Sequence, residues 1–276
     1  MDIIFILNLP VMTRLNDNSP FSKYLLSLRY MKILTLNCQH AYREEELVAF
    51  LSERISSLEY DAILLQELNE KIIPHINSEN GYSLIYNTTV EAEHGRVTIF
   101  LKKGYDILYK EYSIFETEVV MGREYYYEIV SVVFKDSENK EYIFSSLHMP
   151  AYLHIIRRIR YLQRTMRIIK RLKKRFSKES LVVVGGDWNS IFPYEKYFLS
   201  FTIDPRFRFI FPKVYTYHTN KIEPGLFMGN FFKVIASMIS INYILDFFLI
   251  GYRVKGKVSV EEIDISDHNP VTLTLD

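Results

Sequence analysis

Carboxylate, carboxamide and imidazole side chains stand at the ends of several apolar runs in this sequence. The clearest case is LVVVGGDWNS at 181–190, in which three valines and two glycines precede Asp187 and Asn189. The residues at such ends are Asn37, Glu67, His148, Asp187, Asn189, Asp267 and His268, and Asp246 inside the run YILDFFLI at 243–250 completes the set. Each residue alone has a structural alternative, because Asn and Asp often cap turns and a single His often only completes a hydrogen bond in the core. Gathered at the same ends of a sheet, they predict one site.

A set of this kind suits the hydrolysis of a phosphate ester. That reaction brings hydroxide and a leaving alkoxide onto an anionic phosphorus, so positive charge must be supplied. Mg²⁺ prefers oxygen ligands and keeps much of its water, so one or two carboxylates and a carboxamide suffice to hold it. Histidines with pKa values near neutrality can bind phosphate oxygens or move protons. The sequence has no Cys and His spacing of a zinc site, no GxxxxGK[ST] loop and no GxSxG motif.

Short strands and helices alternate along the chain and must position these residues. Apolar runs predict strands at 32–37, 60–67, 82–87, 96–103, 105–115, 125–135, 141–150, 181–184 and 243–250, and after 266–270. Helical spacing predicts helices at 43–58 and 152–178, whereas the stretch from 190 to about 225 is expected to be irregular. Asp246 is expected inside its strand, where a buried acid needs a partner. The glycines at 185–186 are expected to end their strand and to keep side chains away from a phosphate.

The sequence shows no internal repeat, no low-complexity tract and no clear linker, which indicates one globular domain at 31–276. Hydrophobic residues make up 48% of the 276-residue chain, charged residues 24%, and the net charge of +1 gives no global attraction to nucleic acid or membrane. Residues 1–30 are predicted to be a loosely packed extension or to precede the natural start at Met31. The single cysteine, Cys38, fits a reducing compartment and predicts a cytoplasmic protein. Membrane-surface association and an N-terminal signal remain open alternatives.

Six motifs resemble, in order, those of the endonuclease/exonuclease/phosphatase superfamily. They are LTLN at 34–37, LLQEL at 64–68, SLHMP at 146–150, GGDWN at 185–189, YILDFF at 243–248 and SDHNPV at 266–271. The resemblance spans residues 31–276. It implies a DNase I-like α+β fold, a four-layer α/β/β/α sandwich of two mostly antiparallel sheets with the site at one end.

The same resemblance implies a role for each residue of the set. Glu67 would be the main metal ligand, assisted by Asn37 and Asp267, with Mg²⁺ as the metal and Mn²⁺ able to replace it. Asp187 would orient or deprotonate the attacking water, and Asn189 would hold a phosphate oxygen. His268 would contact the phosphate or transfer a proton, and Asp246 would orient its ring. His148 resembles the second histidine of the DNase I and sphingomyelinase branches and would act in catalysis and substrate binding.

Some positions depart from the family pattern. Arg123 resembles a family arginine near the substrate, although a solvent-exposed strand-edge arginine is an equal alternative. Either Glu91 or Glu93 would orient His148. HGRVTIF at 94–100 stands where the family has Gly followed by small apolar residues.

The resemblance predicts a Mg²⁺-dependent hydrolase that cleaves a phosphodiester, in the manner of a nuclease, by metal-assisted in-line attack of water. The alternatives are a phosphoesterase acting on a lipid, an inositol phosphate or a sugar phosphate, and a catalytically silent binding module. The basic helix at 152–178 suits a nucleic-acid backbone or an anionic membrane, unless the acids of REEEL at 43–47 compensate it. The apolar segment at 222–241 suits a lipid, unless it packs in the core. The predicted partner is therefore a phosphate ester, nucleic acid or phospholipid, and the protein is expected to be a monomer without an obligate protein partner.

Overall fold

The computed structural model describes residues 30–39, 43–75, 81–86, 96–120, 123–149, 155–189, 199–200, 202–218 and 242–276. The predicted extension before Tyr30, the apolar segment 222–241, and Glu91 and Glu93 lie outside these residues. Within them, no helix combines the length and the apolar character needed to cross a membrane.

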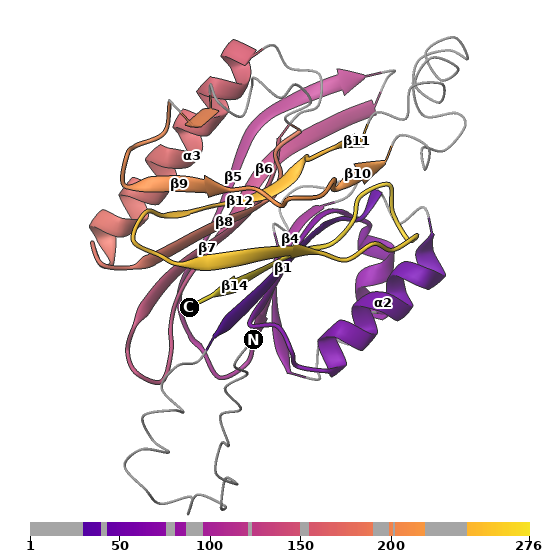
Figure 1. The fold of residues 1–276 in the computed structure, drawn as a ribbon, viewed down its shortest axis with the longest axis horizontal. Helices are drawn as coiled ribbons and strands as arrows, with labels where there is room; N and C mark the ends of the chain where they lie inside the picture. Colours follow the sequence, from indigo (N-terminus) through magenta and orange to yellow (C-terminus); the bar gives the residue numbers. More distant parts are fainter. Residues whose placement is uncertain are drawn as a thin grey trace, which may run out of the picture.

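Two six-stranded sheets form the framework of the described chain (Figure 1). The first has the order β13-β14-β1-β2-β4-β3, and the second has the order β5-β6-β7-β8-β12-β9. The strands of the first are β1 (Met31–Asn37), β2 (Ala62–Leu68), β3 (Tyr82–Tyr86), β4 (Arg96–Lys102), β13 (Gly256–Val260) and β14 (Val271–Leu275). Those of the second are β5 (Asp106–Val120), β6 (Arg123–Lys135), β7 (Glu141–His148), β8 (Leu181–Asp187), β9 (Phe207–Ile210) and β12 (Asp246–Gly251). A short ladder joins β10 (Tyr217–His218) to β11 (Asn242–Tyr243).

In the described part of the chain, one helix covers the outer face of each sheet, which makes four layers (Figure 1). Helix α2 (Glu44–Ser56) buries its apolar stripe against the first sheet, and α3 (Ile155–Arg175) buries its own against the second. A 3₁₀ helix, η2 (Glu70–His75), follows β2. The predicted four-layer α/β/β/α sandwich is confirmed. The suggested compensation of the basic helix by the REEEL acids is wrong, because α2 and α3 lie on opposite sides of the molecule.

The central strands are apolar throughout because both of their faces are covered. In β8, Val182 and Val184 pack under α3, while Val183 faces the other sheet. In β2, Leu64 faces the second sheet, whereas Leu65 faces α2. This burial explains why these runs lack the alternation of apolar and polar residues that a half-exposed strand would show.

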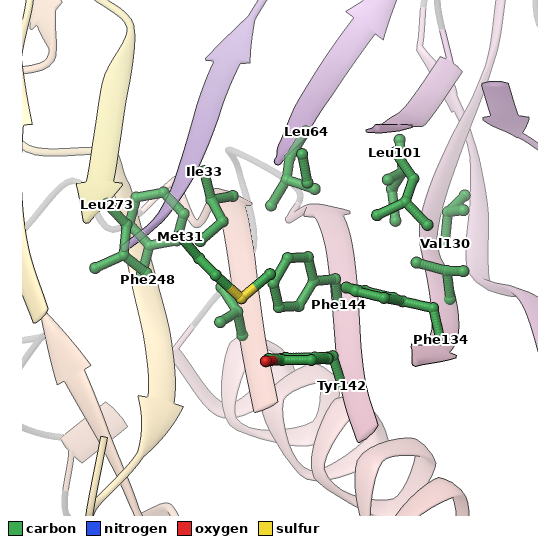
Figure 2. Close-up of a cluster of buried hydrophobic side chains, with 14 of the residues drawn as sticks. Met31, Ile33, Leu64, Leu101, Val130, Phe134, Tyr142, Phe144, Phe248 and Leu273 are labelled. Atoms are coloured by element: carbon green, nitrogen blue, oxygen red, sulfur yellow. The ribbon is translucent and has the colours of Figure 1, made fainter. Parts of the chain in front are cut away.

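An aromatic core holds the two sheets together (Figure 2). The Phe134 ring lies edge-on to Phe144 at 4.9 Å between ring centroids and stacks on Tyr142 at 5.1 Å. Leu64 of the first sheet packs across from them, and Phe248, from β12 of the second sheet, belongs to the same cluster. Each fully buried ring of this kind contributes about 1.5–3 kcal/mol of hydrophobic free energy, so the core fixes the relative position of the strand ends beyond it.

Each sheet contains one parallel pair of strands, and these pairs create the site. β1 runs parallel to β2, and β7 runs parallel to β8, so four carboxyl ends meet at one end of the sandwich. β12 and β14 run antiparallel to their neighbours and begin at that end. Asp246 is therefore the first residue of β12, where it pairs with Asp187, and the expectation of an acid inside the strand is wrong. The stretch expected to be irregular contains the short strands β9 and β10, and β13 is a further strand that the sequence did not predict.

Candidate active site

Four strands deliver a polar side chain to the same end of the sandwich. Asn37, His148 and Asp187 are the last residues of β1, β7 and β8, and Glu67 is the last but one of β2. His148 and Asp187 are direct partners in the parallel register of β7 and β8. Behind them, the buried Gln66 side chain donates to Ser146 Oγ at 2.9 Å and so joins the two sheets. The site thus spans the two sheets at a point where their separation is fixed.

Asn37 bridges two carboxylates. Its Nδ2 donates to Glu67 Oε1 at 3.0 Å and to Asp187 Oδ2 at 2.9 Å. Its Oδ1 accepts the backbone N–H of Gln39 at 2.9 Å, which sets the orientation of the amide. In this orientation the nitrogen, and not the oxygen, faces the carboxylates. Ligation of a metal by Asn37 therefore stays a prediction that requires the amide to leave the Gln39 N–H.

His148 lies between the same two carboxylates. Its Nε2 is 3.3 Å from Glu67 Oε1 and 3.7 Å from Asp187 Oδ2. One ligand atom from each of the three side chains lies within 4.8 Å of the others, an arrangement able to hold a metal ion. The Glu67 and His148 side chains are 17% and 15% exposed, so this part of the site is open to solvent.

A histidine–aspartate pair forms the other side of the site. His268 Nδ1 lies 2.7 Å from Asp246 Oδ2, and its Nε2 lies 3.9 Å from Asp187 Oδ2. Thr216 Oγ1 accepts the backbone N–H of Asp246 at 3.0 Å, and the Tyr217 ring meets His268 edge-on at 4.9 Å between centroids. Asp246 is fully buried, and within the described chain its Oδ1 has no hydrogen-bond partner. Asp246 therefore holds the ring with its Nε2 facing the carboxylates.

Asp267 is anchored to the loop that follows β1. Its backbone N–H donates to Gln39 Oε1 at 3.1 Å, and its Oδ1 lies 3.8 Å from His268 Nε2. Ser266 Oγ donates to the backbone oxygen of Asn37 at 2.8 Å. These bonds connect the turn before β14 to the end of β1, which brings Asp267 to the same cluster.

Asn189 holds Asp187 from the C-terminal side. Its backbone N–H donates to Asp187 Oδ1 at 2.8 Å, and its Nδ2 donates to Asp187 Oδ2 at 2.9 Å and to the Met149 carbonyl at 2.7 Å. Both side-chain N–H bonds are used within the protein, so in this structure Asn189 positions Asp187. Its predicted contact with a phosphate oxygen requires one of these bonds to be exchanged. Trp188 between them is fully buried and stacks on Phe247, with 5.2 Å between ring centroids.

Arg158 of α3 holds the Trp188–Asn189 turn by hydrogen bonds to its backbone. Its side chain is buried, and its Nη1 donates to the backbone carbonyls of Trp188, at 3.1 Å, and of Asn189. The sequence interpretation placed Arg158 with the basic residues of its helix and missed this role. A helical wheel would have shown it, because Arg158 lies three residues after Ile155 and four before Leu162, on the apolar face.

Backbone strain at two positions aims side chains into the cluster. Glu67 has φ = 52° and Asn189 has φ = 46°, values that non-glycine residues rarely adopt. The register of β2 with β4 shifts between Leu65 and Leu68, and a bulge of this kind re-aims a side chain. This turn of the backbone sends Glu67 towards the cluster instead of along the alternating faces of its strand.

The two glycines before Asp187 lie inside β8, so the expectation that they end the strand is wrong. A Cβ on Gly186, which has φ = 151°, would lie 1.9 Å from the Leu147 carbonyl oxygen. A Cβ on Gly185 would lie 2.6 Å from Phe248 and 2.7 Å from Leu64. Close packing of β8 against β7 and against the first sheet therefore requires both glycines.

Burial and neighbouring charges together give the site unusual pKa values. Desolvation raises the pKa of Asp187 to about 6, with a further rise from Asp246 and an opposing effect of His268. Desolvation, helped by Glu67, likewise raises the pKa of Asp267 to about 6, again against His268. Burial alone would lower the pKa of His268, but the surrounding aspartates outweigh it and hold that pKa well above its ordinary value. Carboxyl groups are thus concentrated here, and together they favour the protonated form of His268.

The structure brings all eight residues of the sequence-predicted set together: Asn37, Glu67, His148, Asp187, Asn189, Asp246, Asp267 and His268. Their individual roles stay predictions. Arg123 begins β6, but its side chain lies outside the described residues. Thr216 and Gln39, which hold Asp246 and Asp267, carry no sequence signal that would have identified them.

No protein-family model matches the chain, and no curated protein is significantly similar to it in sequence. Several solved structures share its fold, and the three described below each match 90% of its length. An endonuclease/exonuclease/phosphatase from Bacteroides vulgatus has a TM-score of 0.68 at 16% identity, with 99% of that chain covered. TDP2 from D. rerio complexed with single strand DNA product has a TM-score of 0.68 at 14% identity and 99% coverage. The human Nocturnin catalytic domain with bound sulfate anion has a TM-score of 0.61 at 14% identity, with 93% of that chain covered. At these identities the likeness establishes the backbone fold and leaves the reaction to be argued from the site.

Proposed function

We propose that this chain, which has the fold of the endonuclease/exonuclease/phosphatase superfamily, is a divalent-metal-dependent phosphoesterase that hydrolyses a phosphodiester. One observation carries the proposal. The strand ends place Glu67, Asp187 and His148 within 4.8 Å of one another, beside a buried His268–Asp246 pair. A structural role alone does not require so many like charges at one buried end of a sheet, because each costs desolvation free energy.

The donor set fits Mg²⁺. Carboxylate oxygens are the ligands that Mg²⁺ prefers. The pKa values of Asp187 and Asp267 are raised mainly by burial, so ionising these carboxyls costs free energy that a bound cation would offset. Glu67 and Asp267 would hold the ion, and Mn²⁺ would be accepted by the same oxygens. When bound, the ion supplies positive charge that polarises the phosphate and stabilises the leaving alkoxide.

Asp187 is the residue we assign to the attacking water. With a pKa of about 6 its carboxylate is mostly ionised at neutral pH, yet basic enough to accept a proton. Asn37 and Asn189 hold both of its oxygens, so its orientation is fixed before the substrate arrives. This preorganisation reduces the entropy that would otherwise be lost in reaching the reactive geometry.

The histidines are assigned to the phosphate. The surrounding aspartates raise the pKa of His268, which favours its protonated form. With Nδ1 held by Asp246, the Nε2–H of that form can donate to a phosphate oxygen. His148 lies on the solvent-accessible side, from which a substrate would enter. Donors aimed at the developing negative charge stabilise the transition state more than the ground state.

A substrate panel with Mg²⁺ tests this proposal. An aryl phosphodiester and an aryl phosphomonoester are compared with plasmid DNA, single-stranded DNA, RNA, sphingomyelin, inositol phosphates and sugar phosphates. We expect turnover of phosphodiesters, its loss in Asp187→Asn, and full activity in the exposed control Asp264→Asn. Turnover of monoesters or lipids alone would reject the nuclease-type assignment, and no turnover of any compound would favour a silent binding module.

A further inference from the structure

The solvent-facing side of α3 carries a straight row of cations. The row consists of Arg160, Arg164, Arg167, Arg171 and Lys174, hereafter the outer row, and all five side chains are exposed. The spacing of three and four residues places them on one face of the helix. At 1.5 Å of rise per residue the row extends about 21 Å.

Within the described chain, acidic neighbours do not reach every cation of the outer row. Residues 157–178 contain eleven Lys or Arg and no acid. Among the described residues, Glu111 pairs with Arg171, and Asp204 pairs with Lys170 at 2.9 Å. Within the described chain, no ion pair joins Arg160, Arg167 or Lys174 to an acid. A solvated helix face usually mixes signs, so this face retains a local positive excess in a protein of net charge +1.

The partner that suits this face is a polyanion and not a lipid bilayer. A helix that lies in a membrane interface inserts its apolar face, but the apolar face of α3 is already buried against the second sheet. The exposed apolar side chain described on α3 is Ile156 alone. Four of the five cations in the row are arginines, whose planar guanidinium pairs with phosphate through two parallel hydrogen bonds.

The outer row begins near the candidate active site. Arg158, two residues before Arg160, donates to the carbonyls of the Trp188–Asn189 turn, so the first turns of α3 lie beside the cluster. From there the helix runs back along the outside of the sheet towards the start of β8 (Figure 1). A ligand that occupies both surfaces must bend from the end of the sandwich onto its side. A duplex, with a persistence length of about 150 bp, resists such a bend, whereas a single strand does not.

We propose that the outer row of α3 binds the sugar-phosphate backbone of a single-stranded nucleic acid whose scissile phosphate lies in the Asp187–His268 site. The inference rests on the proposed phosphodiesterase function and adds the substrate class to it. Contacts of this kind are independent of base sequence and strongly salt-dependent, because each bound phosphate releases a counterion.

Binding of fluorescent single-stranded DNA and RNA of mixed sequence tests the proposal across a salt series. The experiment uses the full chain in EDTA, so that cleavage does not interfere, and the triple variant Arg160→Gln/Arg167→Gln/Lys174→Gln. Loss of three contacts should flatten the slope of log K against log salt by about 2 and weaken binding about a hundred-fold at ~0.1 M salt. The matched control Arg253→Gln/Lys255→Gln/Lys257→Gln removes three exposed charges near β13 and should change binding less than about two-fold.

Several outcomes overturn the proposal. If both triple variants weaken strand binding equally, the effect comes from net charge and not from the outer row. Tight binding of anionic lipid vesicles without binding of single strands would show that the face binds a membrane. Preference for duplex over single strands would contradict the bent path. Turnover of a small aryl phosphodiester separates this test from that of the proposed function, because the outer-row variant should retain it. If the wild type does not hydrolyse the aryl phosphodiester, the proposed phosphodiesterase function is wrong. Binding of single strands by the outer row is measured independently of that result.

Discussion

Replacement of the buried Arg158 by methionine tests how the candidate site is held together. The guanidinium donates to the carbonyls of Trp188 and Asn189, and the residue is 2% exposed. Methionine leaves both buried carbonyls without this donor, at about 1–3 kcal/mol each. Relief from burying a charge offsets part of this loss, so we expect the free energy of unfolding to fall by about 3 kcal/mol.

Urea unfolding followed by tryptophan fluorescence measures this change directly, because Trp188 is the single tryptophan of the chain and lies at the affected turn. Arg160→Met, on the exposed face of the same helix, is the matched control and should change the free energy of unfolding by less than about 0.5 kcal/mol. Arg158→Lys keeps the charge but not the fork of donors, so we expect an intermediate value.

The m-value should be the same in all three variants, because none changes the surface exposed on unfolding. A loss below about 1 kcal/mol in Arg158→Met would show that the two carbonyls find other partners and that Arg158 does not hold the turn. An equal loss in Arg160→Met would attribute the effect to helix charge and refute the reasoning from burial.

Three further predictions concern the site and its strands. Asp246→Asn should lower kcat about 10²–10⁴-fold with little change in KM, because His268 loses the partner that fixes its proton on Nδ1; an unchanged kcat would remove the pair from the mechanism. Gly186→Ala should prevent folding or lower Tm by more than about 10 °C, whereas Gly251→Ala, with its nearest neighbour at 3.4 Å, should not; equal Tm values would show that β8 can shift. Because the folded-state pKa of Asp187 is raised to about 6, the metal-free folded protein binds more protons than the unfolded chain between about pH 4 and 6, so its Tm should fall as pH rises through that window. Asp187→Asn should flatten this decline, and a Tm that rises equally in both proteins would contradict it.

The strand ends could be predicted from sequence because each is marked by an abrupt change from apolar to polar residues. The apolar runs LVVV, which precedes Asp187, and AILL, which precedes Glu67, are buried on both faces. Because both faces are covered, a polar side chain in such a strand is expected at its end. The order of six motifs then gave the two-sheet sandwich, which the similarity to solved structures confirms.

What the sequence could not supply depends on contacts between residues far apart in the chain. The strained backbone of Glu67 and the orientation of the Asn37 amide follow from neighbouring strands and loops. Both glycines before Asp187 were assigned to a turn, because the proximity of Leu147 is a property of the β7–β8 pairing. Weak signals account for the missed strands: β9 has four residues and β10 two, and β13 alternates at a half-exposed sheet edge.

The Mg²⁺ dependence of phosphodiester hydrolysis tests the central claim most directly. The initial rate on an aryl phosphodiester is measured after EDTA treatment and Mg²⁺ titration, in the wild type, in Glu67→Gln and in the exposed control Glu53→Gln. We predict a saturable rise of the rate in the wild type and the control, and a loss of at least about 10³-fold in Glu67→Gln, since the ion contributes several kcal/mol of transition-state stabilisation. Hydrolysis that persists in EDTA, or a Glu67→Gln protein with the wild-type Mg²⁺ dependence, would contradict the assignment of this cluster as a metal-dependent phosphoesterase centre.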